Sequence, residues 1–329
     1  MRVLVTGAGG FIGSHLVTAL KRRGHWVRGA DLKHPEFGPT DADEFLLADL
    51  RQADACLAAT RAVDDVYALA ADMGGMGYIS GHHARILHDN ALINIHTLDA
   101  SRANGVRRHL FASSACVYPE GLQQDANVTA LKEADAYPAQ PQDAYGWEKL
   151  VTERLCTHYA ADYGLDVRIA RFHNIFGERG TWQGGREKAP AALCRKVAQV
   201  RLTGNPEVEI WGDGEQTRSF CHVDDCVEGL LRLMASGCQD PINLGQDRMV
   251  SINELADMVA RIAGVRIVKR HVPGPQGVRG RNSDNRRLRE VLGWEPRISL
   301  EAGLERTYAW IEAQLRKTAM RDGREAGVR

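Results

Sequence analysis

The first half of the chain alternates between short apolar runs and longer amphipathic stretches. Short runs of Val, Ile, Leu and Ala are typical of buried strands, and apolar residues repeated every three or four positions are typical of helices. We expect strands at residues 3–6, 26–31, 66–70, 109–112 and 166–171, and helices at 12–23, 87–103 and 145–163. This alternation predicts parallel strands joined by helical crossovers.

The pattern loosens after residue 172. We expect helices at 191–200, 224–234, 252–263 and 300–315, and short strands at 208–211 and 242–244. Ser251, followed three residues later by Glu254, predicts a capping box at a helix start. Segment 271–285 is rich in Pro, Gly and Arg, which predicts a loop or a segment that contacts an anion. The tail at 317–329 is charged and lacks an apolar face, so we expect it to be disordered.

Together these elements predict an α/β protein built on a doubly wound parallel sheet of the Rossmann type, with a smaller C-terminal α/β unit. The 329 residues give room for about two domains, at about 150 residues each. We expect a nucleotide-binding domain at 1–172, to which the chain returns around 219–247, and a substrate domain at 173–316.

Composition narrows the class of protein. With 44% hydrophobic and 26% charged residues, the sequence is that of a folded globular protein. The 42 basic and 42 acidic residues give no net charge, so we expect neither nucleic acid nor a membrane surface as a partner. Seven cysteines without a CxxC pair suggest reduced thiols, no metal site and a cytoplasmic location. There is no apolar run long enough for a membrane span or a signal peptide.

A glycine-rich turn lies between the first strand and the first helix. Gly7, Gly10 and Gly13 form the spacing Gly-x-x-Gly-x-x-Gly, and Phe11 and Ile12 begin the helix. Glycines there permit close approach to a pyrophosphate, which the free N–H groups of a helix start can bind. Taken alone, the spacing also fits an ordinary turn.

The second strand ends in Asp31, and a carboxylate in that place accepts hydrogen bonds from an adenosine ribose and repels the extra phosphate of NADP. NAD is therefore the expected cofactor, although Lys33 lies close enough in sequence to soften that preference. Asp49 and Leu50 are candidates for contact with the adenine, with a helix cap as an equal alternative for Asp49. Ala70 ends the next strand and is a further candidate for cofactor contact.

Two further segments place polar or glycine residues at strand ends, where ligands bind in open parallel sheets. Gly74 and Gly75 follow one strand, where they indicate either close backbone approach to a ligand or a flexible surface loop. Ser114 and Cys116 follow another strand. A free cysteine is most often a small buried hydrophobe, but a thiol at a strand end also suits proton transfer.

Tyr145 and Lys149 are four residues apart in a predicted helix, so their side chains share a face. This pair is common by chance, and exposure to solvent is the simplest explanation for its spacing alone. Because the pair follows a dinucleotide-binding loop and a strand that ends in a hydroxyl, a catalytic role becomes the better interpretation. Lys149 and a cationic nicotinamide would lower the pKa of the Tyr145 phenol, which could then take a proton from a substrate hydroxyl held by Ser114.

The glycine loop, Ser114 and the Tyr145/Lys149 pair, in this order, resemble the extended short-chain dehydrogenase/reductases that act on nucleotide sugars. Several longer segments resemble one family among them more closely, the GDP-mannose 3,5-epimerases. Those segments are 70–77, 113–116, 171–174, 184–190, 216–220 and 277–285. The resemblance covers the whole chain except about its last dozen residues.

The resemblance implies bound NAD, oxidation of carbon 4 of a hexose to a ketone, proton exchange at carbons 3 and 5, and reduction by the same cofactor. It implies Cys116 as the carbon base and Lys188 as the acid on the opposite face. Related carbon-4 epimerases tend to carry Thr where Cys116 stands. It further implies that GDP-mannose becomes GDP-L-galactose, with GDP-L-gulose as a second product, and that a homodimer forms through helices 87–103 and 145–163.

Further residues are implied to contact the substrate, and Lys196 and Arg281 among them would neutralise its diphosphate. These residues are Asn174, Glu187, Ala189, Lys196, Gln216, Thr217, Arg218 and Arg281, together with Gly74, Gly75, Ser114, Cys116, Tyr145 and Lys188. Two alternatives remain open. One is a carbon-4 epimerase or dehydratase acting on another nucleotide sugar, and the other is a non-catalytic NAD-binding sensor.

Overall fold

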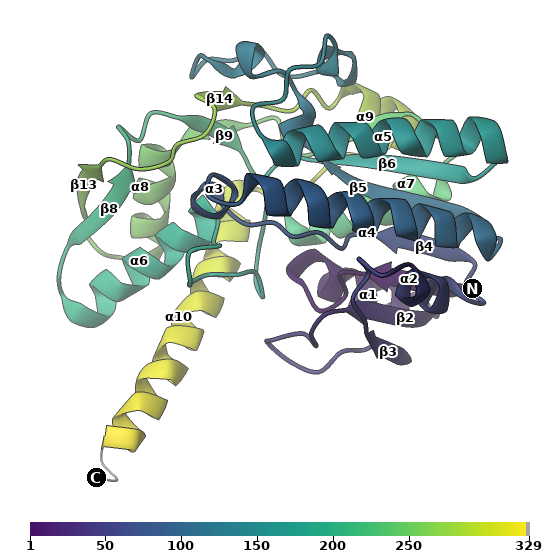
Figure 1. Ribbon diagram of the computed structural model, residues 1–329. Helices are drawn as coiled ribbons and strands as arrows, with labels where there is room; N and C mark the ends of the chain where they lie inside the picture. Colours follow the sequence, from purple (N-terminus) through teal and green to yellow (C-terminus); the bar gives the residue numbers. More distant parts are fainter. Residues whose placement is uncertain (327–329) are drawn as a thin grey trace.

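The computed structural model of the chain describes residues 1–326, with side chains described as far as residue 319. Its larger unit is a parallel sheet of seven strands in the order β11-β6-β5-β4-β1-β2-β3 (Figure 1). The strands are β1 (Arg2–Thr6), β2 (Trp26–Asp31), β3 (Glu44–Leu47), β4 (Asp65–Ala68), β5 (Arg108–Ser114), β6 (Asp166–Phe172) and β11 (Pro241–Leu244). The predicted doubly wound α/β fold is confirmed.

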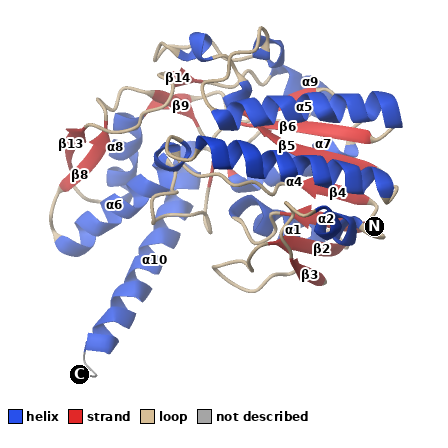
Figure 2. Cartoon of the chain, viewed as in Figure 1, coloured by secondary structure: helices blue, strands red, loops and turns tan. Residues whose placement is uncertain are grey.

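Helices cover both faces of this sheet, as Figure 2 shows in blue against the red strands. One face carries α1 (Phe11–Arg22) and α7 (Val223–Ala235), and the other carries α2 (Ala53–Thr60), α4 (His83–Ala103) and α5 (Ala144–Tyr163). In β1, Val3 and Val5 join the core under α1 and α7, whereas Leu4 joins the core under α2 and α4. Strands buried on both faces explain why the first half of the sequence reads as unbroken apolar runs.

The pattern of the sequence did not indicate β3 or α2. Strand β3 is the edge strand of the sheet, and its Leu47 is exposed, so it lacks the continuous burial that marks the central strands. Strand β11 comes from far along the chain and pairs with β6 at the opposite edge, which brings the second half of the chain back to the sheet.

A smaller unit lies at the other end of the sheet, around a second core. Its main elements are α6 (Ala189–Thr203), β8 (Glu207–Trp211), α8 (Ile252–Ala263), β13 (Val268–Val272) and α10 (Leu300–Ala326). Short elements at the junction are α3 (Met76–Ile79), β7 (Ile175–Phe176), β9 (Thr217–Ser219), β10 (Cys221–His222), β12 (Met249–Ser251), β14 (Gly280–Arg281) and α9 (Arg286–Leu292). The predicted capping box at Ser251 and Glu254 begins α8 and is confirmed.

The expectations for the second half meet different outcomes. Segment 271–285 is mostly loop, as expected, but it contains the end of β13 and all of β14. The tail expected to be disordered from residue 317 is instead helical as far as Ala326, and residues 327–329 lie outside the described part. Helix α10 anchors on buried Leu304, Tyr308 and Ile311, so the following turns extend a helix that is already formed. Among the described helices, none has the length and apolar character needed to cross a membrane.

Candidate active site

The turn between β1 and α1 requires its glycines for geometric reasons. Gly7 has a φ of 69°, in the left-handed region that favours glycine. A Cβ on Gly13 would lie 2.0 Å from the carbonyl oxygen of Gly7, and a Cβ on Gly9 would lie 2.0 Å from that of Lys33. Phe11 and the following residue open α1, so their backbone N–H groups have no helical partner. This cradle of bare backbone fits the pyrophosphate of a dinucleotide.

Asp31 stands at the end of β2, next to this turn. Its carboxylate accepts hydrogen bonds from the backbone N–H of Gly9 at 3.0 Å and of Lys33 at 3.2 Å. Burial raises its pKa, which these hydrogen bonds oppose. The Lys33 ammonium turns away to pair with Glu36 at 3.7 Å, so it leaves the preference for the ribose hydroxyls of NAD over NADP intact.

The remaining cofactor candidates occupy different environments. Ala70 borders the turn, because its backbone N–H donates to Thr6 Oγ1 at 3.1 Å and lies 3.0 Å from the position of a Cβ on Gly7. Leu50 is buried in the core under α2. Asp49 forms an ion pair with Arg51 at 2.7 Å, and the hydrogen bonds from that side chain lower its pKa. Its carboxylate also accepts from the backbone N–H of Arg51, which precedes α2; the N-cap of that helix is Gln52, so Asp49 is not its cap.

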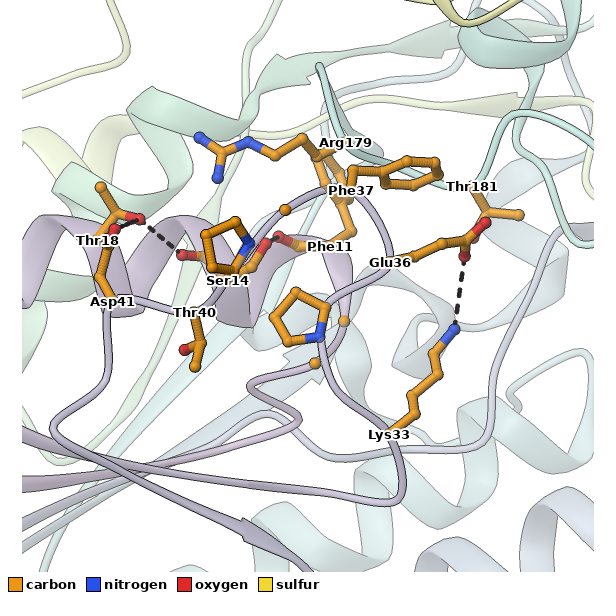
Figure 3. Close-up of a pocket in the computed structure, with 15 residues that line it drawn as sticks. Phe11, Ser14, Thr18, Lys33, Glu36, Phe37, Thr40, Asp41, Arg179 and Thr181 are labelled. Atoms are coloured by element: carbon orange, nitrogen blue, oxygen red, sulfur yellow. Dashed lines mark hydrogen bonds and ion pairs between the residues drawn. The ribbon is translucent and has the colours of Figure 1, made fainter. Parts of the chain in front are cut away.

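A small cavity of about 50 Å³ lies beside the turn, between α1 and the segment that follows β2 (Figure 3). Ser14 and Thr18 line it from α1, and Thr18 donates to Asp41 at 2.6 Å. Gly9, Gly10 and Lys33 also line it, so it adjoins the glycine turn and belongs to the cofactor site.

Ser114, Tyr145 and Lys149 come together at the carboxyl end of β5. Ser114 caps a 3₁₀ turn at Ala115–Val117, and its hydroxyl accepts from the backbone N–H of Cys116 at 3.2 Å. Lys149 is buried, with its ammonium 5.4 Å from the centre of the Tyr145 ring and 3.5 Å from a carboxylate oxygen of Glu148. The first two turns of α5 thus present a phenol and a cation on one face, as the spacing predicted.

The pKa of Tyr145 differs from the expectation. Burial raises it well above its ordinary value, the charges of Glu148 and Cys116 raise it further, and the Ser114 hydroxyl opposes the rise. The expected lowering by Lys149 is therefore not found. A cationic nicotinamide beside the phenol would supply the missing positive charge.

Cys116 lies one turn beyond Ser114 and is half-buried. Its sulfur accepts a hydrogen bond from Arg281 Nη1 at 3.3 Å, and Arg281 Nε donates to Gln123 Oε1 at 2.6 Å. A guanidinium is a charged donor, so its hydrogen bond is stronger than one from a neutral group. The thiol that follows β5 is thus held by a buried cation from β14, at the opposite end of the sequence.

Three cations gather around this thiol. Arg218 in β9 is paired in register with Arg281 in β14, and burial together with the charge of Arg281 lowers its pKa to about 9. Burial also lowers the pKa of Lys188, whereas the nearby Cys116 raises it. Within residues 1–326, Arg218, Arg281 and Lys188 have no carboxylate partner. Unpaired like charges at close range are costly, so this cluster fits a dianionic ligand such as a diphosphate.

Lys188 is the residue that caps α6, and it is half-buried beside the thiol. An amine with a lowered pKa is a better proton donor than an exposed lysine. Gly75 and Gly74 approach the same region, because the N–H of Gly75 donates to the carbonyl oxygen of Arg186 at 3.0 Å. The structure therefore brings Lys188, Cys116 and the glycine loop together.

Other implied substrate residues present free polar atoms or bare backbone. Gln216 is buried, and its Oε1 has no hydrogen-bond partner among the described residues, while its Nε2 donates to the carbonyl oxygen of Trp211. Ser219 Oγ is likewise buried without a partner in that part of the chain. Asn174 has a φ of 48° and donates to the carbonyl oxygen of Ser219 at 2.8 Å. A buried acceptor without a donor indicates a place for ligand or water.

Four of the implied substrate residues have polar side chains bonded elsewhere in the protein or have no polar side chain. Glu187 accepts from the N–H of Gly185 and pairs with Arg195 at 3.2 Å. Thr217 donates to the carbonyl oxygen of Ala126. Lys196, whose pKa burial lowers, donates to the carbonyl oxygen of Glu209 at 2.6 Å along an open groove of about 450 Å³. Ala189 begins α6 directly after Lys188.

Sequence reasoning missed several residues that shape the site. Gln123 holds Arg281, and Asp72, Tyr78 and Arg186 connect the glycine loop to the Lys188 segment. Arg186 lies inside a segment that carried the family resemblance, but nothing in the sequence shows which partner it meets. Among the described side chains, no group of His, Cys, Asp and Glu could hold a metal ion.

Comparison with known proteins defines the class. Residues 3–245 match the model of the NAD dependent epimerase/dehydratase family, and the chain belongs to that family. NAD is accordingly its cofactor, in agreement with the glycine cradle and Asp31. Curated relatives include GDP-mannose 3,5-epimerase from Arabidopsis thaliana and GDP-mannose 3,5-epimerase 1 from Oryza sativa subsp. indica. Each is 52% identical over 319 residues, which is 96% of this chain and 84% and 83% of the relatives.

Solved structures show the same fold. UDP-glucose 4-epimerase from Thermotoga maritima, determined with UDP-glucose, superimposes with a TM-score of 0.85 at 28% identity, over 96% of this chain and all (100%) of that chain. UDP-glucose 4-epimerase from Thermus thermophilus, determined in complex with NAD, has a TM-score of 0.82 at 25% identity, over 94% and 99% of the two chains.

Proposed function

We propose that the chain is an NAD-dependent epimerase that converts GDP-mannose to GDP-L-galactose, with GDP-L-gulose formed when only carbon 5 is inverted. The single observation that carries this proposal is the pairing of a thiol and an amine, Cys116 and Lys188, beside a Tyr145/Lys149 pair. Relatives at 52% identity over 96% of the chain carry the name GDP-mannose 3,5-epimerase, which supports the same substrate.

Oxidation at carbon 4 falls to the residues at the end of β5 and the start of α5. Tyr145 takes the proton of the carbon-4 hydroxyl while Ser114 hydrogen-bonds that oxygen, and the ammonium of buried Lys149 lies 5.4 Å from the centre of the Tyr145 ring. When bound at the glycine turn, NAD would supply the acceptor for the hydride of carbon 4 and the source for its return. A ketone at carbon 4 makes the C–H bonds on carbons 3 and 5 acidic.

The carbon-bound protons fall to Cys116 and Lys188. The thiolate of Cys116, which accepts a hydrogen bond from Arg281, removes a proton from the carbon beside the ketone, and the ammonium of Lys188 delivers a proton to the other face of that carbon. The configuration of the carbon is thereby inverted with no net change in redox state. A carbon-4 epimerase breaks no C–H bond by proton loss and has no use for this pair, so the pairing favours inversion at carbons 3 and 5.

Recognition of the diphosphate falls to the cluster of cations. Arg218 and Arg281 lie on paired strands and donate to backbone carbonyl oxygens, Gln123 and Cys116, with no carboxylate partner among the described residues, and two phosphate groups would neutralise them. The unpaired Gln216 Oε1 offers an acceptor for a hydroxyl or an amino group of the nucleoside.

The test is incubation of the purified protein with GDP-mannose in deuterated water, followed by NMR of the sugar. We expect deuterium at carbons 3 and 5 and the appearance of GDP-L-galactose. Conversion without deuterium at either carbon would contradict the proposal and favour a carbon-4 epimerase. NAD binding without conversion of any nucleotide sugar would favour the non-catalytic sensor.

We further propose that two copies of the chain associate through α4 and α5. These helices pack side by side on one face of the sheet (Figure 1), and their outer surfaces carry large exposed apolar side chains. The exposed side chains are Leu87, Ile95, Trp147 and Val151, at 42%, 38%, 42% and 54% of their maximal exposure. Replacing Val151 with Glu should convert a dimer to a monomer in sedimentation, and a wild-type protein that sediments as a monomer would refute this proposal.

We also propose a cytoplasmic location. All seven cysteines are free thiols in the structure, and five of them are buried, which suits a reducing compartment. Fractionation of cells that express the full chain should recover it with cytoplasmic markers. Recovery with an exported fraction would contradict this location.

A further inference from the structure

The segment that carries Lys188 is fastened to the loop after β4 through one neighbouring residue, Arg186. The Arg186 guanidinium donates from Nη1 to Asp72 Oδ1 at 3.0 Å and to the carbonyl oxygen of Met73 at 3.3 Å. Its own carbonyl oxygen accepts from the N–H of Gly75 at 3.0 Å. The side chain and the backbone of Arg186 thus both bind the loop that follows β4.

An aromatic ring completes this contact. The guanidinium carbon of Arg186 lies 3.6 Å from the centre of the Tyr78 ring, and the ring of His82 stacks on it with centroids 4.2 Å apart. Two groups at such short range must occupy opposite faces of the ring. The Tyr78 hydroxyl donates to Asp72 Oδ2 at 2.9 Å, which closes a triangle of Asp72, Tyr78 and Arg186. We call these three residues the clamp.

The clamp joins the two units of the protein at the site. Asp72 and Tyr78 belong to the sheet unit, after β4, while Arg186 leads into α6 of the smaller unit. Tyr78 is buried in a cluster with Tyr145, against which Cys116 also packs. The close approach leaves no room for a side chain at Gly75, where a Cβ would lie 2.5 Å from the carbonyl oxygen of Glu187. Movement at Arg186 would therefore be passed directly to Lys188, two residues on.

We propose that Arg186 is a positioning residue for proton transfer at carbon, because the clamp sets where the Lys188 amine stands relative to Cys116. This inference rests on the proposed function and deepens it. Oxidation at carbon 4 depends on Ser114, Tyr145 and Lys149, which belong to the sheet unit. Tyr78, which packs with Tyr145, keeps its hydrogen bond to Asp72 when Arg186 is removed. Proton delivery by Lys188 depends on how the smaller unit is positioned relative to the sheet.

This division predicts a selective defect. In Arg186→Ala the clamp loses its ion pair and its ring contact, and a displacement of the amine by about 1 Å would slow proton transfer by about 100-fold. Deuterium uptake at carbons 3 and 5 of GDP-mannose, measured by NMR in deuterated water, should fall by that factor. Formation of reduced cofactor on mixing with GDP-mannose, followed by its absorbance, should change by less than about threefold, a difference of under 0.7 kcal/mol.

Two further variants sharpen the test. Arg186→Lys keeps a cation near Asp72 but lacks the planar group over Tyr78, so deuterium uptake should fall by about tenfold, between the wild type and Arg186→Ala. Arg85→Ala is the matched control, because Arg85 also pairs with Asp72, at 3.5 Å, from outside the Lys188 segment. Its deuterium uptake and cofactor reduction should both stay within about twofold of the wild type, as for an exposed ion pair.

The outcomes separate the inference from the proposed function. Unchanged deuterium uptake in Arg186→Ala would overturn the inference, and so would a parallel loss of cofactor reduction and deuterium uptake, which indicates a general structural role. An equal defect in Arg85→Ala would also overturn it. Failure of the wild type to take up deuterium from GDP-mannose would instead refute the proposed function.

Discussion

Replacement of Glu153 by Gln should destabilise the protein and leave the chemistry of its site residues in place. Glu153 in α5 and Arg171 in β6 are both buried, and Arg171 donates to the two carboxylate oxygens at 2.8 and 2.6 Å. The hydroxyl of Ser113 donates to the same carboxylate at 2.5 Å. In Glu153→Gln the guanidinium keeps its place without a charged partner.

The magnitude follows from burial. Breaking a buried pair by removing one partner costs about 3–5 kcal/mol, because the remaining charge stays desolvated. At about 2.1 cal/mol/K per residue, cooperative unfolding of 329 residues has an entropy of about 0.7 kcal/mol/K. The midpoint temperature Tm should therefore fall by about 4–7 °C.

The assay is thermal unfolding followed by circular dichroism at fixed protein and NAD concentrations. Glu301→Gln is the control, because Glu301 forms a pair of similar length, 2.8 Å with Arg248, but both side chains are about half exposed. An exposed pair contributes under about 1 kcal/mol, so the control should shift Tm by about 1 °C or less. Equal shifts for the two variants would refute the reasoning from burial.

Three further outcomes follow from the site. Cys116→Thr should still form reduced cofactor with GDP-mannose, but its deuterium uptake, measured by NMR, should fall by about 100- to 10,000-fold because the base is lost. Burial lowers the pKa of Lys188, and the amine must be protonated to act as an acid, so kcat should fall with rising pH below the ordinary lysine value of 10.5; Lys188→Arg should remove that limb of the pH–rate profile. Although burial opposes it, hydrogen bonds from His222 and Arg306 lower the pKa of Glu178 from 4.5 to about 2. Its contribution to stability is present above pH 4.5 and lost as pH falls toward 2, so acid unfolding of Glu178→Gln should show a weaker pH dependence across that range.

The sequence was most informative where a local pattern carries the physical constraint. Unbroken apolar runs require burial on both faces, which only a covered parallel sheet provides. The glycines at Gly7 and Gly13 follow from a turn in which any side chain would meet backbone. Edge strand β3 and the short helix α2 escaped this reasoning, because partial burial weakens the periodic signal.

The charge environment of the site was harder to predict from the sequence. The sequence placed Tyr145 and Lys149 on one face, yet burial and Glu148 raise the pKa of the phenol. Gln216 and Thr217 are neighbours in sequence, but one has a buried oxygen without a partner in residues 1–326 and the other is bonded to backbone. Such differences depend on residues that meet through folding and are far apart in the chain.

By itself, the sequence determined the α/β class, the dinucleotide turn, the NAD preference of Asp31 and the identity of the groups able to move protons. Each depends on neighbours in the chain or on side-chain chemistry. Only the tertiary structure decided that Arg281 donates to the sulfur of Cys116 across 165 positions, and that Arg186 fastens the Lys188 segment to Asp72 across 114. Both contacts arise because the smaller unit packs against the carboxyl ends of the strands, an arrangement that no local pattern encodes.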